Sequence, residues 1–292
     1  MKKGIKIKIK NNIYRINASN TAGFLFLMAF ALFAALPLIY VISTSLKPLN
    51  ELFLFPPRFF VEKPTLDNFT DLFQALDGES VPFSRYVFNS FFVSITVVCL
   101  TIMTSTLGAY GLVKHKVLGG KLIVSLIMAG LMFSTYVTRI PAFTIISKLG
   151  LVDSYGALII PNIAVAYNIF LMKQFMEQIP DQLLEAARID GAGEARILVS
   201  IVTPMLKPVV ATLFVLSFVS NWNDYFSPMI YIQNESLKTL PVVLQNLSSN
   251  NSIARAGATA AATFVTIVPT IFVYALIQRH VVDSMAYSGI KE

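Results

Sequence analysis

Residues 22–42, AGFLFLMAFALFAALPLIYVI, contain no charged side chain and decide the class of fold. A helix needs about 20 consecutive apolar residues to cross the hydrocarbon core of a bilayer, and this stretch is long enough. The residues before it are basic, as in a secretory leader, and Ala29-Phe30-Ala31 fits a cleavage motif. However, a leader has an apolar region of only about 7–15 residues, and here the motif lies inside the run. We therefore expect a retained membrane anchor.

Five further segments have the length and apolar character of membrane spans. They are residues 87–112, 122–138, 157–175, 201–220 and 257–277. The segment 201–220 differs from the others, because it contains Pro204 and Pro208 and ends at Asn221. A proline-broken helix leaves backbone groups that lipid cannot satisfy, so we expect this span to line a cavity or to pack on partners. The sequence predicts an all-α integral membrane protein with six transmembrane helices.

The composition supports a membrane protein and argues against a nucleic-acid-binding one. Of the 292 residues, 55% are hydrophobic and 13% are charged, whereas a soluble domain has about 25% charged residues. The net charge is +7, but the basic residues lie before and between the apolar runs instead of forming one patch. The single cysteine, Cys99, lies in an apolar segment and can form neither an internal disulfide nor a cysteine-based metal cluster. We expect no metal site.

Lysine and arginine are concentrated in alternate connections, which predicts the orientation. The basic residues expected on one side are Lys2, Lys3, Lys6, Lys8, Lys10, Arg15, Lys114, Lys116, Lys121, Lys173, Arg188, Arg196, Lys207, Arg279 and Lys291. The segment 47–86, on the other side, carries six acidic residues against four basic ones. We therefore expect both termini in the cytoplasm, with 1–21 as a basic cytoplasmic segment, 22–280 as the six-span domain and 281–292 as a cytoplasmic tail.

Two runs of small residues are expected to allow close approach of helices, since packing inside a membrane relies on small side chains. They are residues 105–111, STLGAYG, and residues 257–262, GATAAA. The alternative for both is a backbone gate.

Few ionisable residues fall inside the predicted spans, although ion-coupled carriers place such groups there to hold the coupling ion. Arg139 lies at the outer end of the third span, where it can extend to the interface, and His115 lies in a basic, solvated connection. Residues 119–122, GGKL, lack the glycine spacing and the hydroxyl residue of a nucleotide-binding P-loop. The chain therefore carries no visible energy source of its own.

The segment 179–204, between spans four and five, predicts a short helix, a turn and a second helix. Pro180 ends the preceding element, and Asp181 can cap the new helix or lie in its first turn. Leu183, Leu184, Ala187 and Arg188 recur with helical spacing, and Gly191 and Gly193 then end the helix. The helix pattern alone is equally typical of an ordinary cytoplasmic connector.

The full spacing is more specific: Glu185-Ala186-Ala187, three residues, Gly191, nine residues, Ile201 and then Pro204. It resembles the EAA loop of binding-protein-dependent ABC importer permeases, with Thr203 where leucine is usual. Most of the chain from about residue 25 onward is similar to carbohydrate permeases of the maltose-permease type. The resemblance is carried by Ala109-Tyr110 with Leu112, SKLGL at 147–151, Pro161, FLMKQF at 170–175, EAARIDGA at 185–192, NWNDY at 221–225 with Pro228, and the tail 278–289.

The resemblance implies a transport subunit that is not itself an enzyme. It implies a second permease that forms a heterodimer with this chain and two ATPase subunits that hold ATP and Mg²⁺. It also implies an extracytoplasmic solute-binding protein that delivers a sugar. This chain would bind no cofactor. Residues implied to couple to the ATPase are Glu185, Ala186, Ala187, Arg188, Asp190 and Gly191.

Residues implied to line the sugar path are Asn221, Trp222, Asn223, Asp224 and Tyr225. Their amide, carboxylate and aromatic groups suit a sugar, and the alternative is a structural cap where a broken helix ends, above all for Asp224. The polar segment 222–258 is expected to be an external loop that contacts the binding protein, or else a solvated connector. Two other functions remain open, a self-sufficient secondary transporter or channel, and a membrane scaffold or sensor.

Overall fold

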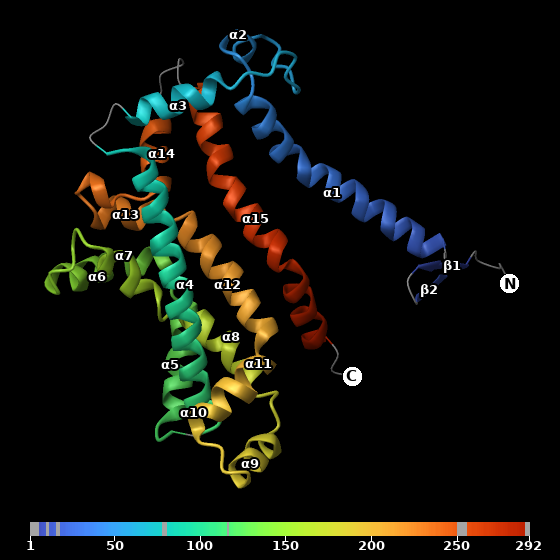
Figure 1. Ribbon diagram of the computed structural model, residues 1–292, viewed down its shortest axis with the longest axis vertical. Helices are drawn as coiled ribbons and strands as arrows, with labels where there is room; N and C mark the ends of the chain where they lie inside the picture. The colour runs from blue at the N-terminus through green and yellow to red at the C-terminus, as the bar shows by residue number, and fades with distance from the viewer. Residues whose placement is uncertain are drawn as a thin grey trace. The chain divides into compact units, whose positions relative to one another are not determined.

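A computed structural model describes residues 6–9, 12–15, 18–77, 81–115, 117–249 and 256–289 (Figure 1). Strands β1 (Lys6–Ile9) and β2 (Asn12–Arg15) pair as an antiparallel hairpin. The helices are α1 (Ala18–Ser45), α2 (Leu49–Leu52), α3 (Asp67–Asp77), α4 (Phe83–Val113), α5 (Gly120–Met132), α6 (Thr135–Lys148), α7 (Tyr155–Ile159), η1 (Ile160–Asn162), α8 (Ala166–Met176), α9 (Asp181–Ile189), α10 (Glu194–Ile197), η2 (Leu198–Val202), α11 (Thr203–Met205), α12 (Lys207–Trp222), α13 (Phe226–Tyr231), η3 (Glu235–Leu237), α14 (Leu240–Ser249) and α15 (Ala256–Gly289).

The helices confirm the predicted number of spans by length and composition. Three of them, α1, α4 and α15, are long and apolar enough to cross a membrane alone. Three bent pairs supply up to three more, so that the described residues contain as many as six spans. The last helix, α15, continues to Gly289, past the predicted end of the membrane domain at residue 280. The helical fold expected from the apolar runs is therefore correct, with the β1–β2 hairpin added before α1.

The segment 122–138, predicted as the third span, is not one continuous helix. Helix α5 ends at Met132, and α6 leaves at 115° to it. The break has a local cause, since the Ser134 side chain accepts a hydrogen bond from the Tyr136 N–H and so caps a new helix. The segment 157–175 is also broken, with a 42° bend between η1 and α8.

The fifth span is broken as its prolines predict. The helical segment that ends at Met205 meets α12 at an angle of 77°. Pro208 occupies the first turn of α12, where a missing backbone N–H costs least.

The chain divides into two compact units, of which the first comprises the described residues of 1–72 and 252–264. Its connections are held by buried polar side chains. Asn68 Nδ2 donates to the carbonyl oxygens of Ser45 and Lys47 at 2.9 and 2.7 Å. Glu51 is buried and accepts from the backbone N–H groups of Glu62 and Lys63, both at 3.1 Å.

Gly257 supports the prediction of a close approach at the start of the last span. A Cβ atom at this position would lie 1.9 Å from Asn68 Oδ1, so only glycine fits. In the second unit, a Cβ at Gly108 would lie 3.9 Å from Ile169 on α8, and Ala109 beside it is fully buried. The close approach is therefore found at Gly257, whereas Gly108 leaves room for a Cβ atom in ordinary contact with α8, and a Cβ at Gly111 would meet nothing within 4 Å.

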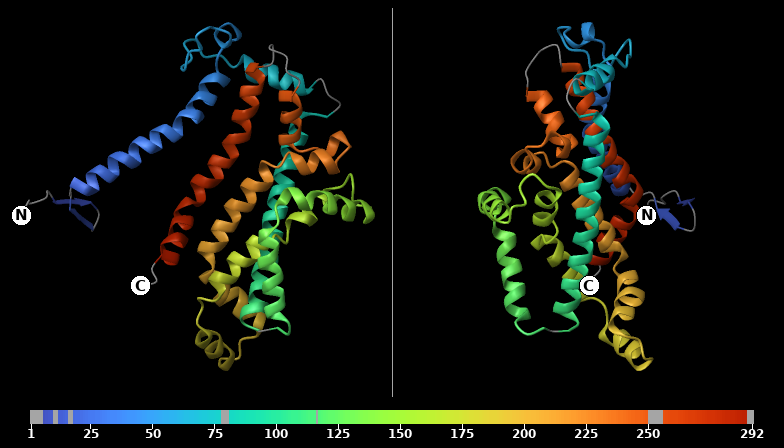
Figure 2. Two further views of the ribbon diagram at one scale, coloured as in Figure 1. Left: turned by 180° about the vertical axis from the view of Figure 1, so that it is seen from behind. Right: turned by 60° about the vertical axis from the view of Figure 1, so that its left-hand side comes forward.

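The second unit comprises the described residues of 73–251 and 265–292, and α4 forms its centre. Helices α8 and α12 pack along α4, and α5 packs on α8 (Figure 2). Threonines of α4 satisfy carbonyl groups that the broken fourth span leaves free: Thr101 donates to Asn162 O at 3.1 Å and Thr104 to Ile163 O at 2.7 Å. Polar residues of α4, the second span, therefore stabilise the irregular backbone of the fourth span.

The polar segment 222–258 is largely helical, which corrects its prediction as a loop. It contains α13, η3 and α14, while residues 250–255 lie outside the described part of the chain. Leu240 and Val243 are buried. Asn89 of α4 donates to the carbonyl oxygens of Ser236 and Lys238 at 2.9 and 2.8 Å, which fixes this connection to the second span.

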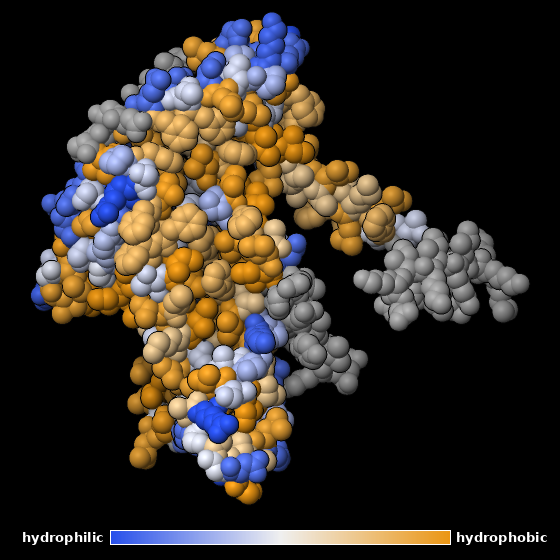
Figure 3. Space-filling view, viewed as in Figure 1, coloured by the Kyte–Doolittle hydropathy of each residue, from blue (hydrophilic) through white to orange (hydrophobic). Residues whose placement is uncertain are grey.

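Large apolar side chains cover the outside of the second unit. Met103 of α4 and Leu126 of α5 are 58% and 63% exposed. Figure 3 shows a largely apolar visible face on this unit, with polar side chains gathered where α9 and α10 lie. Exposed apolar surface of this extent requires lipid or a partner protein instead of water.

Candidate functional site

Helix α9 joins the bundle through one face and leaves the opposite face open. Leu184 and Ala187 are buried in a cluster with Met176, Ile197 and Leu206 from the ends of the spans. Figure 1 shows α9 at the extreme end of the second unit, beyond the end of α5. The face turned outward carries exposed side chains, among them Leu183, Glu185, Ala186 and Ile189. The short helix is therefore fixed to the spans and available to a partner.

The turn after α9 explains why glycine is required at position 191. Gly191 has φ +82°, the left-handed conformation that a side chain disfavours. Its N–H donates to Arg188 O at 3.0 Å, and Ala192 N–H donates to Ala187 O at 2.9 Å. These two bonds form a Schellman C-cap, which satisfies the last carbonyl groups of α9 and turns the chain toward α10.

A cluster around Glu194 connects α9 and α10 with the end of α4. Arg188 Nε donates to Glu194 Oε1 at 2.8 Å, and the Tyr110 hydroxyl donates to Glu194 Oε2 at 2.6 Å. His115 Nε2 lies 3.3 Å from the same oxygen. Arg188, predicted as a coupling residue, thus pairs with Glu194 inside its own loop. His115, expected as a solvated residue, lies beside the same carboxylate. Sequence reasoning missed Tyr110 and Glu194, which are 84 residues apart in the chain.

Lys114 holds the start of the same loop. Its Nζ donates to Ile179 O at 2.5 Å and to Asp181 Oδ1 at 2.7 Å. Its side chain is 3% exposed, so the charge is buried and paired. Lys114 was predicted only as an orientation signal, and the structure gives it a second role as an anchor for α9.

The lowered pKa of Glu194 keeps its carboxylate charged, so its part in this connection should be lost only in strong acid. Hydrogen bonds from Arg188 and Tyr110 lower the pKa of the Glu194 carboxyl to about 2 from an ordinary value of 4.5. Because the pKa in the folded state is lower, the contribution of the charged carboxylate is present above pH 4.5 and is lost as the pH falls toward 2. We therefore expect α9 to stay equally ordered at pH 7 and pH 5 in the wild-type chain.

Glu194→Gln should loosen α9 at both of these pH values, because the amide cannot replace the charge that Arg188 faces. The measurement is the mobility of a spin label at Gln182→Cys in a Cys99→Ser background, on the exposed side of α9. Equal mobility in the two chains at pH 7 would show that the cluster does not hold α9.

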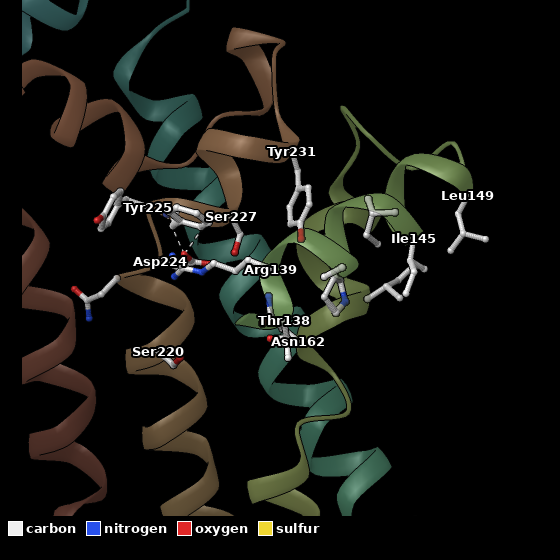
Figure 4. Close-up of a pocket in the computed structure, with 16 residues that line it drawn as sticks. Thr138, Arg139, Ile145, Leu149, Asn162, Ser220, Asp224, Tyr225, Ser227 and Tyr231 are labelled. Carbon is white, nitrogen blue, oxygen red and sulfur yellow. Dashed lines mark hydrogen bonds between the residues drawn. The ribbon is translucent and has the colours of Figure 1, made fainter. Parts of the chain in front are cut away.

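The second region is a cavity of about 630 Å³ in the second unit. It lies between α6, η1, the end of α12 and α13 (Figure 4). Its walls mix polar and apolar side chains, as a ligand pocket requires. The lining residues are Thr138, Arg139, Ala142, Ile145, Ile146, Leu149, Ile160, Pro161, Asn162, Ser220, Asn223, Asp224, Tyr225, Phe226, Ser227 and Tyr231.

Three of the five residues predicted for the sugar path line this cavity: Asn223, Asp224 and Tyr225. Tyr225 is 44% exposed, so its ring is available to a ligand. Asp224 Oδ1 accepts hydrogen bonds from the N–H groups of Phe226 and Ser227 at 3.0 and 3.1 Å (Figure 4). This oxygen caps the first turn of α13, which is the structural alternative that the sequence left open.

The other two predicted residues, Asn221 and Trp222, do not line this cavity. Trp222 is 1% exposed, its ring stacks on Phe218 with centroids 5.7 Å apart, and its Nε1–H donates to Thr266 O at 2.9 Å. Asn221 Nδ2 donates to Ser217 O at 2.7 Å within α12. Trp222 therefore connects α12 with its neighbours, whereas the bond of Asn221 lies within α12.

Sequence reasoning missed Arg139 as a cavity residue, and it missed the further polar contributors Thr138, Asn162, Ser220, Ser227 and Tyr231. Arg139 was expected at the outer end of the third span, within reach of the interface, and the structure adds that it lines the cavity. The signal was faint, because these residues come from separate helices that only the breaks in spans three and four bring together.

Comparison with known proteins identifies the family. Residues 101–287 match the family described as the binding-protein-dependent transport system inner membrane component. This range covers the end of α4, the whole of α9 and the cavity.

Individual relatives agree over nearly the full chain. The arabinooligosaccharides transport system permease protein AraQ of Halalkalibacterium halodurans is 30% identical over 93% of this chain and 95% of its own. The sulfoquinovosyl glycerol transport system permease protein SmoH of Agrobacterium fabrum is 33% identical over 87% of this chain and 88% of its own. A solved bacterial ABC transporter involved in the import of the acidic polysaccharide alginate matches with a TM-score of 0.79 and 25% identity over 92% of this chain and 99% of that one.

The matching proteins are permease subunits of transport systems and not enzymes. The family match includes the segment with the EAA spacing. The chain belongs to the family of binding-protein-dependent transport system inner membrane components.

Proposed function

We propose that this permease carries a saccharide across the cytoplasmic membrane as one of two permease subunits of an ABC importer. Two ATPase subunits, which hold ATP and Mg²⁺, drive the cycle, and an extracytoplasmic binding protein delivers the saccharide. This chain itself binds no cofactor. The observation that carries the proposal is α9, a short helix docked through Leu184 and Ala187 with its other face open at the end of the bundle.

The open face of α9 is where we place the ATPase contact. Leu183 and Ile189 are 45% and 86% exposed, and small Ala186 lies between them in sequence, so an apolar partner surface can approach closely. Among the described residues Glu185 forms no salt bridge, and its carboxylate is available to a basic group of the ATPase. Asp190 and Gly191 then fix the angle of the helix. Closure of the ATPase pair would move α9 as a rigid body together with the attached spans.

The cavity is where we place part of the sugar path. Tyr225 offers an aromatic face to the apolar face of a sugar ring, and Asn223 offers amide hydrogen bonds to hydroxyl groups. Asp224 contributes mainly by capping α13. Asn221 and Trp222 do not line this cavity, and we assign them to the structure of α12 and not to contact with the substrate.

Purification and reconstitution test the proposal. Expressed with its neighbouring genes, the chain should co-purify with a second permease and an ATPase. Proteoliposomes of that complex should accumulate a saccharide only with ATP inside and the binding protein outside. A secondary transporter or channel predicts transport by this chain alone, without ATP, and that result would refute the proposal.

The orientation is part of the proposal: both termini and the segment 173–208 lie in the cytoplasm. In a Cys99→Ser background, a cysteine at Arg196→Cys should resist an impermeant thiol reagent applied to intact cells, because the membrane shields it. A cysteine at Gln233→Cys, in the connection between α13 and η3, serves as the matched external control and should react. Labelling at position 196 in intact cells would reverse the topology.

A further inference from the structure

Arg139 is held in the cavity by two aromatic rings. Its guanidinium carbon lies 3.4 Å from the centroid of the Phe226 ring and 4.6 Å from that of Tyr136. Phe226 belongs to α13 and Tyr136 to α6, so two separate elements fix the side chain. The rings stack against the flat faces of the guanidinium. Its N–H groups point outward along the edge and remain free to donate.

Arg139 enters the cavity without a salt bridge in the described part of the chain. It is the one basic residue among the described residues that line the cavity. The carboxylate of Asp224 lines the same cavity and keeps its charge; two N–H groups of α13 hold its Oδ1 against that helix, and no salt bridge joins it to Arg139. Further polar groups line the same cavity, from Asn162, Ser227 and Tyr231, and Figure 4 shows the Arg139 side chain running toward Asp224.

We propose that this cavity accepts an acidic saccharide, whose carboxylate, sulfonate or phosphate binds the edge of the Arg139 guanidinium. A planar, stacked guanidinium donates two parallel hydrogen bonds to such a group, which a neutral sugar cannot match. The polar groups beside it are placed to bind the sugar hydroxyls. This inference rests on the proposed function, since it names the class of substrate that the same cavity takes.

The test uses the complete importer in proteoliposomes with its binding protein, supplied with matched pairs of probes. Each pair is an acidic saccharide (an oligouronate, a sugar sulfonate or a sugar phosphate) and its neutral counterpart without the acidic group. Arg139→Gln should lower uptake of the acidic probe by roughly ten- to a hundredfold, the value of a charged hydrogen-bonded contact, and leave any uptake of the neutral probe unchanged. Arg139→Lys should retain part of the acidic uptake. Lys148→Gln is the matched control, because Lys148 is a basic, exposed residue of α6 outside the cavity, and it should behave as wild type.

The outcomes separate this inference from the proposed function. If the wild-type importer takes up only neutral saccharides, or if Arg139→Gln lowers both kinds of uptake equally, the inference is wrong and the importer remains. If no saccharide is taken up with ATP and the binding protein present, the proposed function itself fails.

A lipid headgroup has the same anionic chemistry as an acidic saccharide, so uptake is repeated in liposomes with and without anionic lipid. A variant effect that vanishes without anionic lipid would assign Arg139 to the headgroup and overturn the inference.

Discussion

Gly191→Pro is expected to reduce ATP-driven uptake at least a hundredfold while the permease stays in the membrane. Proline fixes φ near −65°, whereas position 191 requires +82°. It also removes the N–H that donates to Arg188 O at 3.0 Å. The Schellman cap therefore cannot form, which costs about 3 kcal/mol or more. Helix α9 then loses its angle to the spans, and closure of the ATPase no longer reaches them.

The neighbouring glycine provides the matched control. Gly193 has φ −72°, and a Cβ atom there would meet nothing within 4 Å, so Gly193→Ala should transport normally. Gly191→Ala should be intermediate, because the left-handed conformation costs an alanine about 1–2 kcal/mol. Uptake is measured in cells with the amount of permease in the membrane determined in parallel. Normal uptake by Gly191→Pro would show that the turn has no part in coupling.

The number of membrane spans could be predicted from the sequence because it depends on local apolar length. Each apolar run of about 20 residues marks one crossing, whatever it packs against. The breaks were harder to predict. Pro204 and Pro208 revealed the bend in span five, but the bend after Met132 depends on Ser134 capping a new helix, and a serine at the end of an apolar run is an ambiguous signal.

Polar residues inside α4 could not be interpreted without the fold. Thr101, Thr104 and Asn89 bond to backbone groups 59 to 149 residues away in sequence. Their partners are free only because another span is broken or because a connection folds back onto α4. No local pattern reports such a need.

The structure of the segment 179–204 was well predicted where its requirements are local. Helix α9, its end and the special role of Gly191 follow from the spacing of Leu184, Ala187 and the glycine. The Glu194 cluster was not predicted, since its partner Tyr110 comes from another helix. The run at 221–225 was treated as one element, whereas the end of α12 at Trp222 divides it into residues that support the helix and residues that face the cavity.

This division leads to opposite expectations for Trp222→Ala and Tyr225→Ala. Trp222 is 1% exposed and contacts Phe91 and Phe218 with ring centroids 4.9 and 5.7 Å away. Its removal leaves a cavity and should cost about 3–5 kcal/mol of stability. Trp222→Phe retains an aromatic ring but loses the hydrogen bond to Thr266 O, so it should cost less, about 1 kcal/mol.

Tyr225→Ala should instead leave stability nearly unchanged, because the ring is 44% exposed, and should weaken uptake by lowering affinity for the saccharide. The thermal unfolding temperature of the purified complex and the concentration dependence of uptake in proteoliposomes distinguish the two effects. Trp222→Ala should lower the unfolding temperature by several degrees, whereas Tyr225→Ala should raise the KM for uptake at an unchanged unfolding temperature. A Trp222→Ala complex as stable as wild type but impaired in KM would place the indole in the sugar path after all. The helix end at Trp222 would then not separate support from contact, and the cavity would have to extend behind α12.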